Sequence, residues 1–531
     1  MLANLPAELL VKILDNLDSF ALTSCRFVNR SFDDVIKSSS LLQYKLELGL
    51  AGVDANPACT LAPSECLEAV RSYRRGWENL AWSSSDGWRE ATGSVSHNRG
   101  TFTLGEVVAK GDDDHYYYKL RTQRLQLKSR HRRLEERTWS EDRPINIIPV
   151  GIDPSQDLLF AIPNANCGEV RILTLSTFEP HPGVAHPTVS LPVGQESSVE
   201  MDVYKSNVAA ATHLRFTFKF EGSILVYNWR TGAMLVEISY PCDDFFFLTE
   251  DLVACYVTWR DPTDRPSHFA VFRIPDTRNV APSQEPSPTT TPLCVFDLPH
   301  SIDGKSWYLA WQGRMNSSYG SCPPPNDPAV PFYASGRRLL FTLWSLPYSS
   351  FWGSPECSLI IPLRTLLNHA PSEPTPSTTV FHWDTWGPSG TRLLSGIDAR
   401  QMSLQFGWKI ARLGPPDPSN MPLWPSRDVG ITVYDFNPLP FHGPPDVTER
   451  EEWEPETDAV GRTKRVVTSP SSCPDSAELA GVQTYLPYRI TSAPFELRGR
   501  AADHDNYEIS LGEDGMIVWT HLTLDYAVLT I

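Results

Sequence analysis

The sequence RFTFKFEGSILVYNWRTGAMLVEI, residues 215–238, shows the pattern that decides the fold of most of this chain. In residues 215–220 three phenylalanines alternate with polar side chains, which is typical of a strand buried on one face. The Glu-Gly pair at 221–222 and the Arg-Thr-Gly run at 230–232 are turn signals. Strands this close in sequence pair as an antiparallel meander, so we predict three adjacent strands here.

Similar strand-like segments recur downstream as far as residue 530, and no long amphipathic helix is evident after about residue 90. The chain contains 57 aromatic residues (16 Trp, 18 Tyr and 23 Phe) and 46 Pro. Aromatic residues favour strands, whereas prolines collect in connections. Many short strands without interleaved helices indicate a sandwich, a barrel or a propeller. Because residues 91–531 are too long for one sandwich, we predict a large irregular β-propeller of about six to eight blades.

The N-terminal residues follow a helical pattern instead. The first helix carries an apolar stripe at helical spacing, made of Leu9, Leu10, Ile13, Leu14 and Leu17. A second helix begins near Asp18 or Ser19, either of which can cap it, and a third lies near residues 32–36. Three short helices bury little surface, so this unit needs a partner or a neighbouring domain to cover its remaining apolar face.

This segment closely resembles an F-box. The resemblance rests on LPxELLxxILxxL at residues 5–17 and LxxCRxVNR at residues 22–30, with Phe32 where many members have tryptophan. The family implies a docking role, in which an F-box binds a Skp-type adaptor that bridges it to a cullin scaffold. The positions that the family implies for adaptor contact and inter-helix packing are Leu5, Pro6, Leu9, Ile13, Leu14, Leu17, Leu22 and Val28. The alternative is that these residues form the core of a helical cap on the chain's own β domain.

A helical spacer is expected after this module. Residues 41–50 have a partly helical pattern that ends at Gly49 or Gly52, and Ser64 can cap a further helix. Its Arg-x-x-Trp ending resembles the spacer of expanded F-box families in mushroom-forming fungi, and VYNWRTG resembles the end of a degenerate WD-type blade. The expected division is an F-box-like module at 1–45, a helical spacer at 46–90 and a β-propeller-like recognition domain at 91–531.

Composition excludes several classes of protein. A net charge of -17 and a pI near 5.2 argue against general nucleic-acid binding and against docking on anionic membranes. No apolar run approaches the roughly 20 residues of a membrane span, and the N-terminus does not have the pattern of a secretory signal. The ten cysteines show no CxxC pair and no zinc-finger spacing. We therefore expect a cytoplasmic or nuclear protein with reduced cysteines, no metal and no cofactor.

Three other motifs can each be explained without a functional site. Asp112-Asp-Asp-His115 is typical of a solvated turn rather than of a cation site. The GKS run at 304–306 has Pro299 where a phosphate-binding loop requires glycine. The basic segment 119–137 is either an import signal or acidic-partner patch, or a strand whose cationic edge deters pairing.

The sequence thus predicts a non-enzymatic adaptor that binds a Skp-type subunit, and through it a cullin, and holds a protein substrate of unknown identity. No GxSxG, HExxH or GxGxxG motif occurs, and catalysis would come from proximity alone. Two alternatives stay open: a propeller scaffold without a ligase link, and an enzyme with an active site in a propeller channel. Adaptor binding distinguishes the first of these, and a ligand in the channel the second.

Overall fold

The computed structural model describes residues 5–84 without a break and a series of segments beyond them. These segments are 89–90, 94–98, 101–112, 115–126, 129, 131–133, 137–144, 147–153, 157–163, 169–174, 176–190, 210–211, 215–220, 223–249, 251–257, 266–275, 289–299, 306–309, 327–333, 339–345, 357–373, 377–395, 406–414, 428–442, 456–459, 461–472, 481–496, 507–520 and 525–530.

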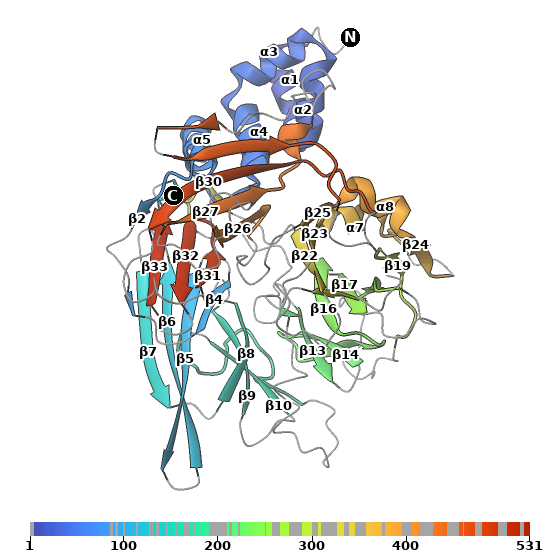
Figure 1. Ribbon diagram of the computed structural model, residues 1–531. Helices are drawn as coiled ribbons and strands as arrows, with labels where there is room; N and C mark the ends of the chain where they lie inside the picture. The colour runs from blue at the N-terminus through green and yellow to red at the C-terminus, as the bar shows by residue number, and fades with distance from the viewer. Residues whose placement is uncertain are drawn as a thin grey trace.

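The N-terminal part is helical, as predicted, and lies at one end of the molecule (Figure 1). Its helices are α1 (Ala7–Leu14), α2 (Ser19–Val28), α3 (Arg30–Ser38), α4 (Ser40–Ala51) and α5 (Pro63–Asn79). The Asp18 carboxylate accepts a hydrogen bond from the Ala21 amide at 2.7 Å and so caps α2. Gly52, with φ of 72°, ends α4 in the left-handed conformation that glycine adopts without strain.

Two details of the spacer differ from the sequence-based expectation. Helix α5 begins at Pro63 with Ala62 as its N-cap, so the prediction that Ser64 caps it was wrong. Proline has the backbone angle of a first helical turn, and the Glu65 carboxylate accepts a hydrogen bond from the Ala62 amide at 3.2 Å. Helix α4 runs across the expected boundary between residues 45 and 46, so the N-terminal module and the spacer share one helix.

Beyond α5 the described residues form seven sheets of four or five strands that succeed one another along the chain. The first sheet holds β4 (Ser94–Asn98), β5 (Thr101–Asp112), β6 (His115–Gln126) and β7 (Arg137–Pro144), and the second β8 (Ile147–Asp153), β9 (Leu158–Pro163), β10 (Glu169–Thr174) and β11 (Thr188–Ser190). The third holds β12 (Ala210–Ala211), β13 (Arg215–Phe220), β14 (Ser223–Asn228) and β15 (Met234–Ser239). The fourth holds β16 (Asp244–Thr249), β17 (Leu252–Val257), β18 (His268–Arg273), β19 (Cys294–Asp297) and β24 (Thr379–Phe381).

The remaining sheets come from the C-terminal half. The fifth holds β20 (Ser306–Leu309), β22 (Leu339–Ser345), β23 (Cys357–Pro362) and β25 (Arg392–Ser395). The sixth holds β26 (Lys409–Gly414), β27 (Asp428–Asp435), β30 (Tyr488–Glu496), β29 (Thr463–Val467) and β28 (Glu456–Thr457). The seventh holds β31 (Tyr507–Leu511), β32 (Gly515–Thr520), β33 (Asp525–Thr530), β2 (Ser83–Ser84) and β3 (Arg89–Glu90). Mainly strand structure after the helices was the expectation, and it is confirmed.

The meander predicted at residues 215–238 is confirmed in the third sheet. Strand β13 pairs antiparallel with β14, and β14 pairs antiparallel with β15. The Asn228 side chain accepts hydrogen bonds from the amides of Arg230 and Thr231 at 2.9 and 3.3 Å, which closes the turn between β14 and β15. The Arg-Thr-Gly signal at 230–232 therefore marks a real turn, whereas the Glu-Gly pair at 221–222 lies outside the described residues.

The first strands of neighbouring sheets lie beside one another. Strand β31 contacts both β26 and β4, and β12 contacts both β8 and β16. The seventh sheet also joins the two ends of the β region, because β2 and β3 both pair antiparallel with β33. The last residues of the expected spacer, 83–84 and 89–90, are therefore strands hydrogen-bonded to β33 and not part of a helix.

Residues 119–126 of the basic segment form a strand, as one interpretation predicted, but the exposed edge in that interpretation was wrong for these residues. Strand β6 lies between β5 and β7, and both of its edges are hydrogen-bonded. Asp112 and His115 face each other at the end of the β5–β6 hairpin, as a turn requires. Of the GKS run, only Ser306 lies within the described residues.

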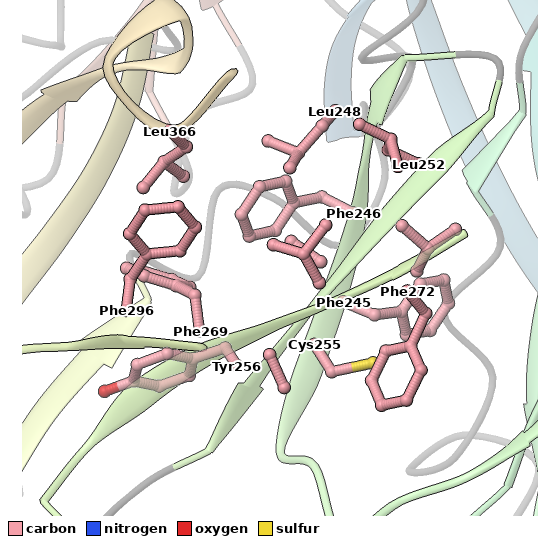
Figure 2. Packing of buried hydrophobic residues seen from close by; sticks show 14 of the residues in the cluster. Phe245, Phe246, Leu248, Leu252, Cys255, Tyr256, Phe269, Phe272, Phe296 and Leu366 are labelled. Carbon is pink, nitrogen blue, oxygen red and sulfur yellow. The ribbon is translucent and has the colours of Figure 1, made fainter. Parts of the chain in front are cut away.

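A helical insertion joins the fourth and fifth sheets. Between β23 and β25 the chain forms α7 (Leu363–His369), β24 and α8 (Trp383–Gly390), and β24 pairs parallel with β19 of the preceding sheet. The Phe296 and Phe381 rings stack at 5.1 Å, and the Trp386 indole donates a hydrogen bond to the Asp297 carbonyl at 3.1 Å. Figure 2 shows phenylalanine side chains of the fourth sheet gathered beside Leu366 of α7. This apolar cluster is the largest core of the described residues.

Gly515 tests the packing at the junction of β32 and β33. A Cβ atom on Gly515 would lie 2.0 Å from the backbone oxygen of Leu529, whereas a Cβ on Gly481 would meet nothing within 4 Å. We expect Gly515→Ala to lower the free energy of unfolding by about 3 kcal/mol, because the backbones of the two strands must separate. Gly481→Ala is the matched control and should stay within about 0.5 kcal/mol. Thermal unfolding followed by circular dichroism measures both, and equal midpoints for the two variants would contradict this packing.

Candidate functional site

Exposed apolar side chains gather on the N-terminal helices. The large apolar side chains that stay exposed among the described residues are Leu9, Ile13, Phe27, Val28 and Leu41 on α1, α2 and α4, and Val380 and Tyr485 elsewhere. Leu9 and Ile13 lie four residues apart on α1 and are 46% and 45% exposed, and Val28 at the end of α2 is 66% exposed. We call Leu9, Ile13, Phe27 and Val28 the exposed apolar set. Five of the seven large apolar side chains that are exposed among the described residues thus lie on α1, α2 and α4.

The eight residues that the sequence singled out separate into two groups. Leu14 and Leu22 are buried in the module's core, and Leu5 and Leu17 pack against it partly buried. Pro6, Leu9, Ile13 and Val28 are exposed. The same sequence pattern therefore supplies both the core of the module and an uncovered face.

Helix α4 completes this core. Leu42 and Leu46 of α4 pack with Leu10, Val35 and Ile36 of the first three helices. The module's core therefore extends into the helix that begins the spacer. If α1 were only a cap on the β domain, its stripe would be covered, but Leu9 and Ile13 remain exposed.

Phe27 and Leu41 were missed by the sequence reasoning. Phe27 occupies the unspecified position of the CRxVNR segment and is 52% exposed, and Leu41 is 37% exposed at the start of α4. Phe27 is five residues after Leu22, so it points away from the face of α2 that Leu22 buries. The sequence did offer a signal for Phe27, because it is an aromatic residue that lies off the buried face of a short helix.

An ion-paired carboxylate joins α2 to α3. The Asp33 carboxylate contacts the Lys37 ammonium at 2.5 Å and the Arg26 guanidinium at 3.0 Å. The hydrogen bond from Lys37, together with Arg26, holds the pKa of Asp33 below its ordinary value in spite of some burial. These contacts fix the angle between the helices that carry Phe27 and the core residues Val35 and Ile36.

Comparison with known families identifies this module. The model of the F-box-like family matches residues 2–45. The N-terminus carries an F-box-like domain. No curated protein matches the chain. The resemblance of the spacer to that of fungal F-box families stays a prediction.

Solved structures show only a distant likeness. BamB from Moraxella catarrhalis is 9% identical over 85% of this chain and all of its own, with a TM-score of 0.29. Hsv2 from Kluyveromyces lactis is 8% identical over 83% of this chain and 91% of its own, with a TM-score of 0.31. Raptor from Chaetomium thermophilum is 8% identical over 85% of this chain and 28% of its own, with a TM-score of 0.34. TM-scores this low do not establish a shared fold.

A chain of ion pairs connects the helix shared with the F-box-like domain to the sixth sheet. The Arg74 guanidinium of α5 contacts Glu47 of α4 at 2.9 Å and Glu78 at 2.7 Å. Arg489 of β30 contacts the same Glu78 carboxylate and Asp435 of β27, both at 2.8 Å. Burial alone would raise the pKa of Asp435, but Lys409 and Arg489 outweigh it and lower that pKa. These ion pairs join α4 to α5 and α5 to the sixth sheet, so they fix the direction of both helices relative to the sheet.

The C-terminal end of α4 is held by the segment after β27. The Asn437 side-chain amide donates hydrogen bonds to the carbonyls of Gly49 and Leu50 at 2.8 and 2.9 Å. These carbonyls belong to the last turn of a helix and have no partner within it. On the other side, the Arg364 guanidinium of α7 lies 4.8 Å from the centre of the Phe20 ring of α2. The end of α4 and helix α2 of the F-box-like domain are thus attached to the segment after β27 and to α7, respectively.

A third attachment is a buried cluster at the seventh sheet. Arg132 contacts the carboxylates of Glu513 and Asp514 and donates a hydrogen bond to the Phe332 carbonyl at 3.2 Å. The Tyr73 hydroxyl of α5 donates to the Glu513 carbonyl at 2.8 Å. Burial raises the pKa of Tyr73, so its hydroxyl stays protonated and can donate at any physiological pH. Arg132, which belongs to the basic segment 119–137, therefore makes buried contacts inside the protein.

Two further observations concern other kinds of site. Within the described segments, no group of three or more His, Cys, Asp or Glu side chains is placed to hold a metal ion. None of the described helices combines the length and the apolar character that a membrane crossing requires.

Arg489→Met tests the ion-pair chain. The substitution keeps much of the side-chain volume but leaves Asp435 and Glu78 without their shared cation. We expect the free energy of unfolding to fall by about 2 kcal/mol, less than for a fully buried pair because these side chains are partly exposed. Arg133→Met removes the half-exposed contact to Glu65 at 3.3 Å and should cost less than about 0.5 kcal/mol. Equal thermal unfolding midpoints for both variants would show that the chain of ion pairs does not stabilise the protein.

Proposed function

We propose that this chain is the substrate-recognition subunit of a cullin-type ubiquitin ligase, docked through its F-box-like domain on a Skp-type adaptor. The observation that carries the proposal is the exposed apolar set on the matched F-box-like domain. The helices bury Leu14 and Leu22 to hold their own shape, while Leu9, Ile13, Phe27 and Val28 stay available. The adaptor would bind these residues and connect the chain to a cullin.

The exposed apolar set can supply a substantial part of the binding energy. Covering a half-exposed side chain of this size contributes roughly 1 kcal/mol, so the four residues together contribute about 4 kcal/mol. A few residues usually carry most of the binding energy of an interface, so a small set of this size is sufficient for an anchor. The F-box-like domain is already folded on α4, so the adaptor does not have to order it.

We also propose that the seven sheets are the blades of one β-propeller. Three features support a ring: the sheets follow one another in sequence, the first strands of several neighbouring sheets are in contact, and β33 pairs with β2 and β3. A propeller joined in this way leaves only short sheet edges exposed. Its surface would hold the protein substrate, with the F-box-like domain at residues 1–45 and the spacer at 46–90 held beside it.

In this proposal the chain performs no covalent chemistry. It raises the local concentration of substrate lysines near a ubiquitin-loaded enzyme that the cullin recruits. The ion pairs and hydrogen bonds of the spacer keep the substrate at a constant distance and direction from the adaptor. The protein would act in the cytoplasm or the nucleus, with neither a nucleic acid nor a membrane as partner.

A scaffold without a ligase link is the second candidate. The observation in its favour is the close attachment of α4 and α5 to the sixth and seventh sheets, which a structural cap would also need. A cap alone does not require the exposed apolar set. Binding of an adaptor therefore separates the two candidates.

A pull-down of the purified full-length chain by a Skp-type adaptor tests the proposal. We expect the wild-type chain to bind and the Leu9→Asp/Ile13→Asp double variant to bind at least about 100-fold more weakly, because two charges would have to be buried without partners. Both side chains are exposed, so the variant should keep the β-rich circular dichroism of the wild type.

Val380→Asp is the matched control, since Val380 is an exposed apolar residue on β24, outside the F-box-like domain. It should bind the adaptor like the wild type. A folded wild-type chain that fails to bind would favour the scaffold, and equal loss in the double variant and the control would place the contact elsewhere.

A further inference from the structure

Two cysteines of the spacer lie in contact. The Sγ atoms of Cys59 and Cys66 are 3.8 Å apart, and neither cysteine is in a disulfide. Cys59 belongs to the loop before α5 and is half-buried, whereas Cys66 lies in the first turns of α5 and is 4% exposed. A small molecule can therefore reach Cys59 first, and Cys66 lies directly behind it.

The loop that carries Cys59 holds a strap, the name we use for residues 327–333, which lie between β20 and β22 in the chain. Within the strap, β21 (Phe332–Tyr333) pairs antiparallel with β1 (Asp54–Ala55). Asn56 donates from its backbone amide to the Pro331 carbonyl at 3.1 Å and from its side chain to the Val330 carbonyl at 2.9 Å. The Thr60 amide donates to the Pro328 carbonyl at 3.0 Å. The strap is thus attached on both sides of Cys59, and Cys66 belongs to the helix next to it.

We propose that Cys59 and Cys66 form a thiol-oxidation site that reacts with small disulfides such as glutathione disulfide and closes into an intramolecular disulfide. The geometry carries the proposal, because the two sulfurs already touch and only a small rotation separates contact from a bond. The bond would close a ring of residues 59–66 and fix the loop to α5. It would thereby lock the strap onto the spacer.

The reaction proceeds in two exchanges. The Cys59 thiolate attacks one sulfur of the small disulfide, forms a mixed disulfide and releases one thiolate. Cys66 then loses its proton, attacks the Cys59 sulfur and expels the second small thiolate. In total two cysteine thiols give up two electrons and two protons, and one small disulfide becomes two thiols.

The fold controls the rate of the second exchange, because the attacking Cys66 is buried. Burial, with the neighbouring Cys59 thiol, raises the pKa of Cys66 to about 12. The thiolate fraction of Cys66 therefore rises roughly tenfold for each pH unit through the neutral range. The rate at which the Cys59 mixed disulfide closes should therefore rise with pH in the same way.

Peptide mapping of the full-length chain tests the site directly. No lysine or arginine lies between Lys45 and Arg71, so trypsin releases residues 46–71 as one peptide whose only cysteines are Cys59 and Cys66. After treatment with glutathione disulfide and alkylation, we expect this peptide to lack two hydrogens and carry no alkyl group. Two alkyl groups on the peptide, or a lasting glutathione adduct on Cys59, would overturn the proposal.

Variants separate the two steps. Cys66→Ser should accumulate the glutathione adduct on Cys59, and Cys59→Ser should leave Cys66 unmodified because it is buried. Cys25→Ser is the matched control, since Cys25 is half-buried in α2, and it should close the disulfide like the wild type. Reaction of Cys66 in Cys59→Ser as fast as that of Cys59 in Cys66→Ser would contradict the assigned order.

Thermal unfolding gives a separate test of whether the disulfide secures the strap. Oxidised wild-type protein should unfold at a temperature higher by roughly 2–4 °C than reduced protein, and Cys59→Ser should show no such difference. An unchanged or lower midpoint after closure would show that the bond does not secure the strap. None of these measurements involves an adaptor, so they stand or fall separately from the proposed ligase function.

Discussion

The pairing of β33 with β2 and β3 sets the position of the spacer and, through the spacer, that of the F-box-like domain. Strand β2 begins at Ser83, four residues after α5 ends at Asn79, so its hydrogen bonds to β33 hold the spacer next to the seventh sheet. From that position Tyr73 reaches the Glu513 carbonyl and Arg489 reaches Glu78. The F-box-like domain follows, because α4 is part of both its core and the spacer.

The helices and sheets meet through an apolar core and through ion pairs and hydrogen bonds, and the polar contacts contribute differently from the apolar ones. A buried ion pair adds little net stability, because both charges lose their hydration. Glu47, Arg74, Glu78, Arg489 and Asp435 therefore act mainly through geometry: each carboxylate or guanidinium accepts only a narrow set of partner positions. An apolar contact of similar area would tolerate sliding, whereas these pairs select one orientation of the spacer.

The F-box-like domain divides one apolar pattern between two surfaces. Helix α1 has leucine or isoleucine at positions 9, 10, 13 and 14, which is more apolar area than its small core can bury. Leu10 and Leu14 face α3 and α4, and Leu9 and Ile13 face solvent. The excess is the uncovered area on which the proposed docking to an adaptor rests. In the proposed ligase subunit, the attached spacer would give the sheets a defined position relative to that adaptor.

The amino-acid sequence by itself determined the local structure: the helices near residues 7–38, the meander at 215–239 and the turn at Asn228. Periodicity and turn residues act over a few positions, so they can be read without the rest of the chain. The tertiary structure alone decided which apolar residues are exposed, why Arg132 is buried, why β24 joins the preceding sheet, and that Cys59 touches Cys66. Each depends on the position of a neighbouring segment, often hundreds of residues away, and side-chain spacing along one segment carries no information about that neighbour.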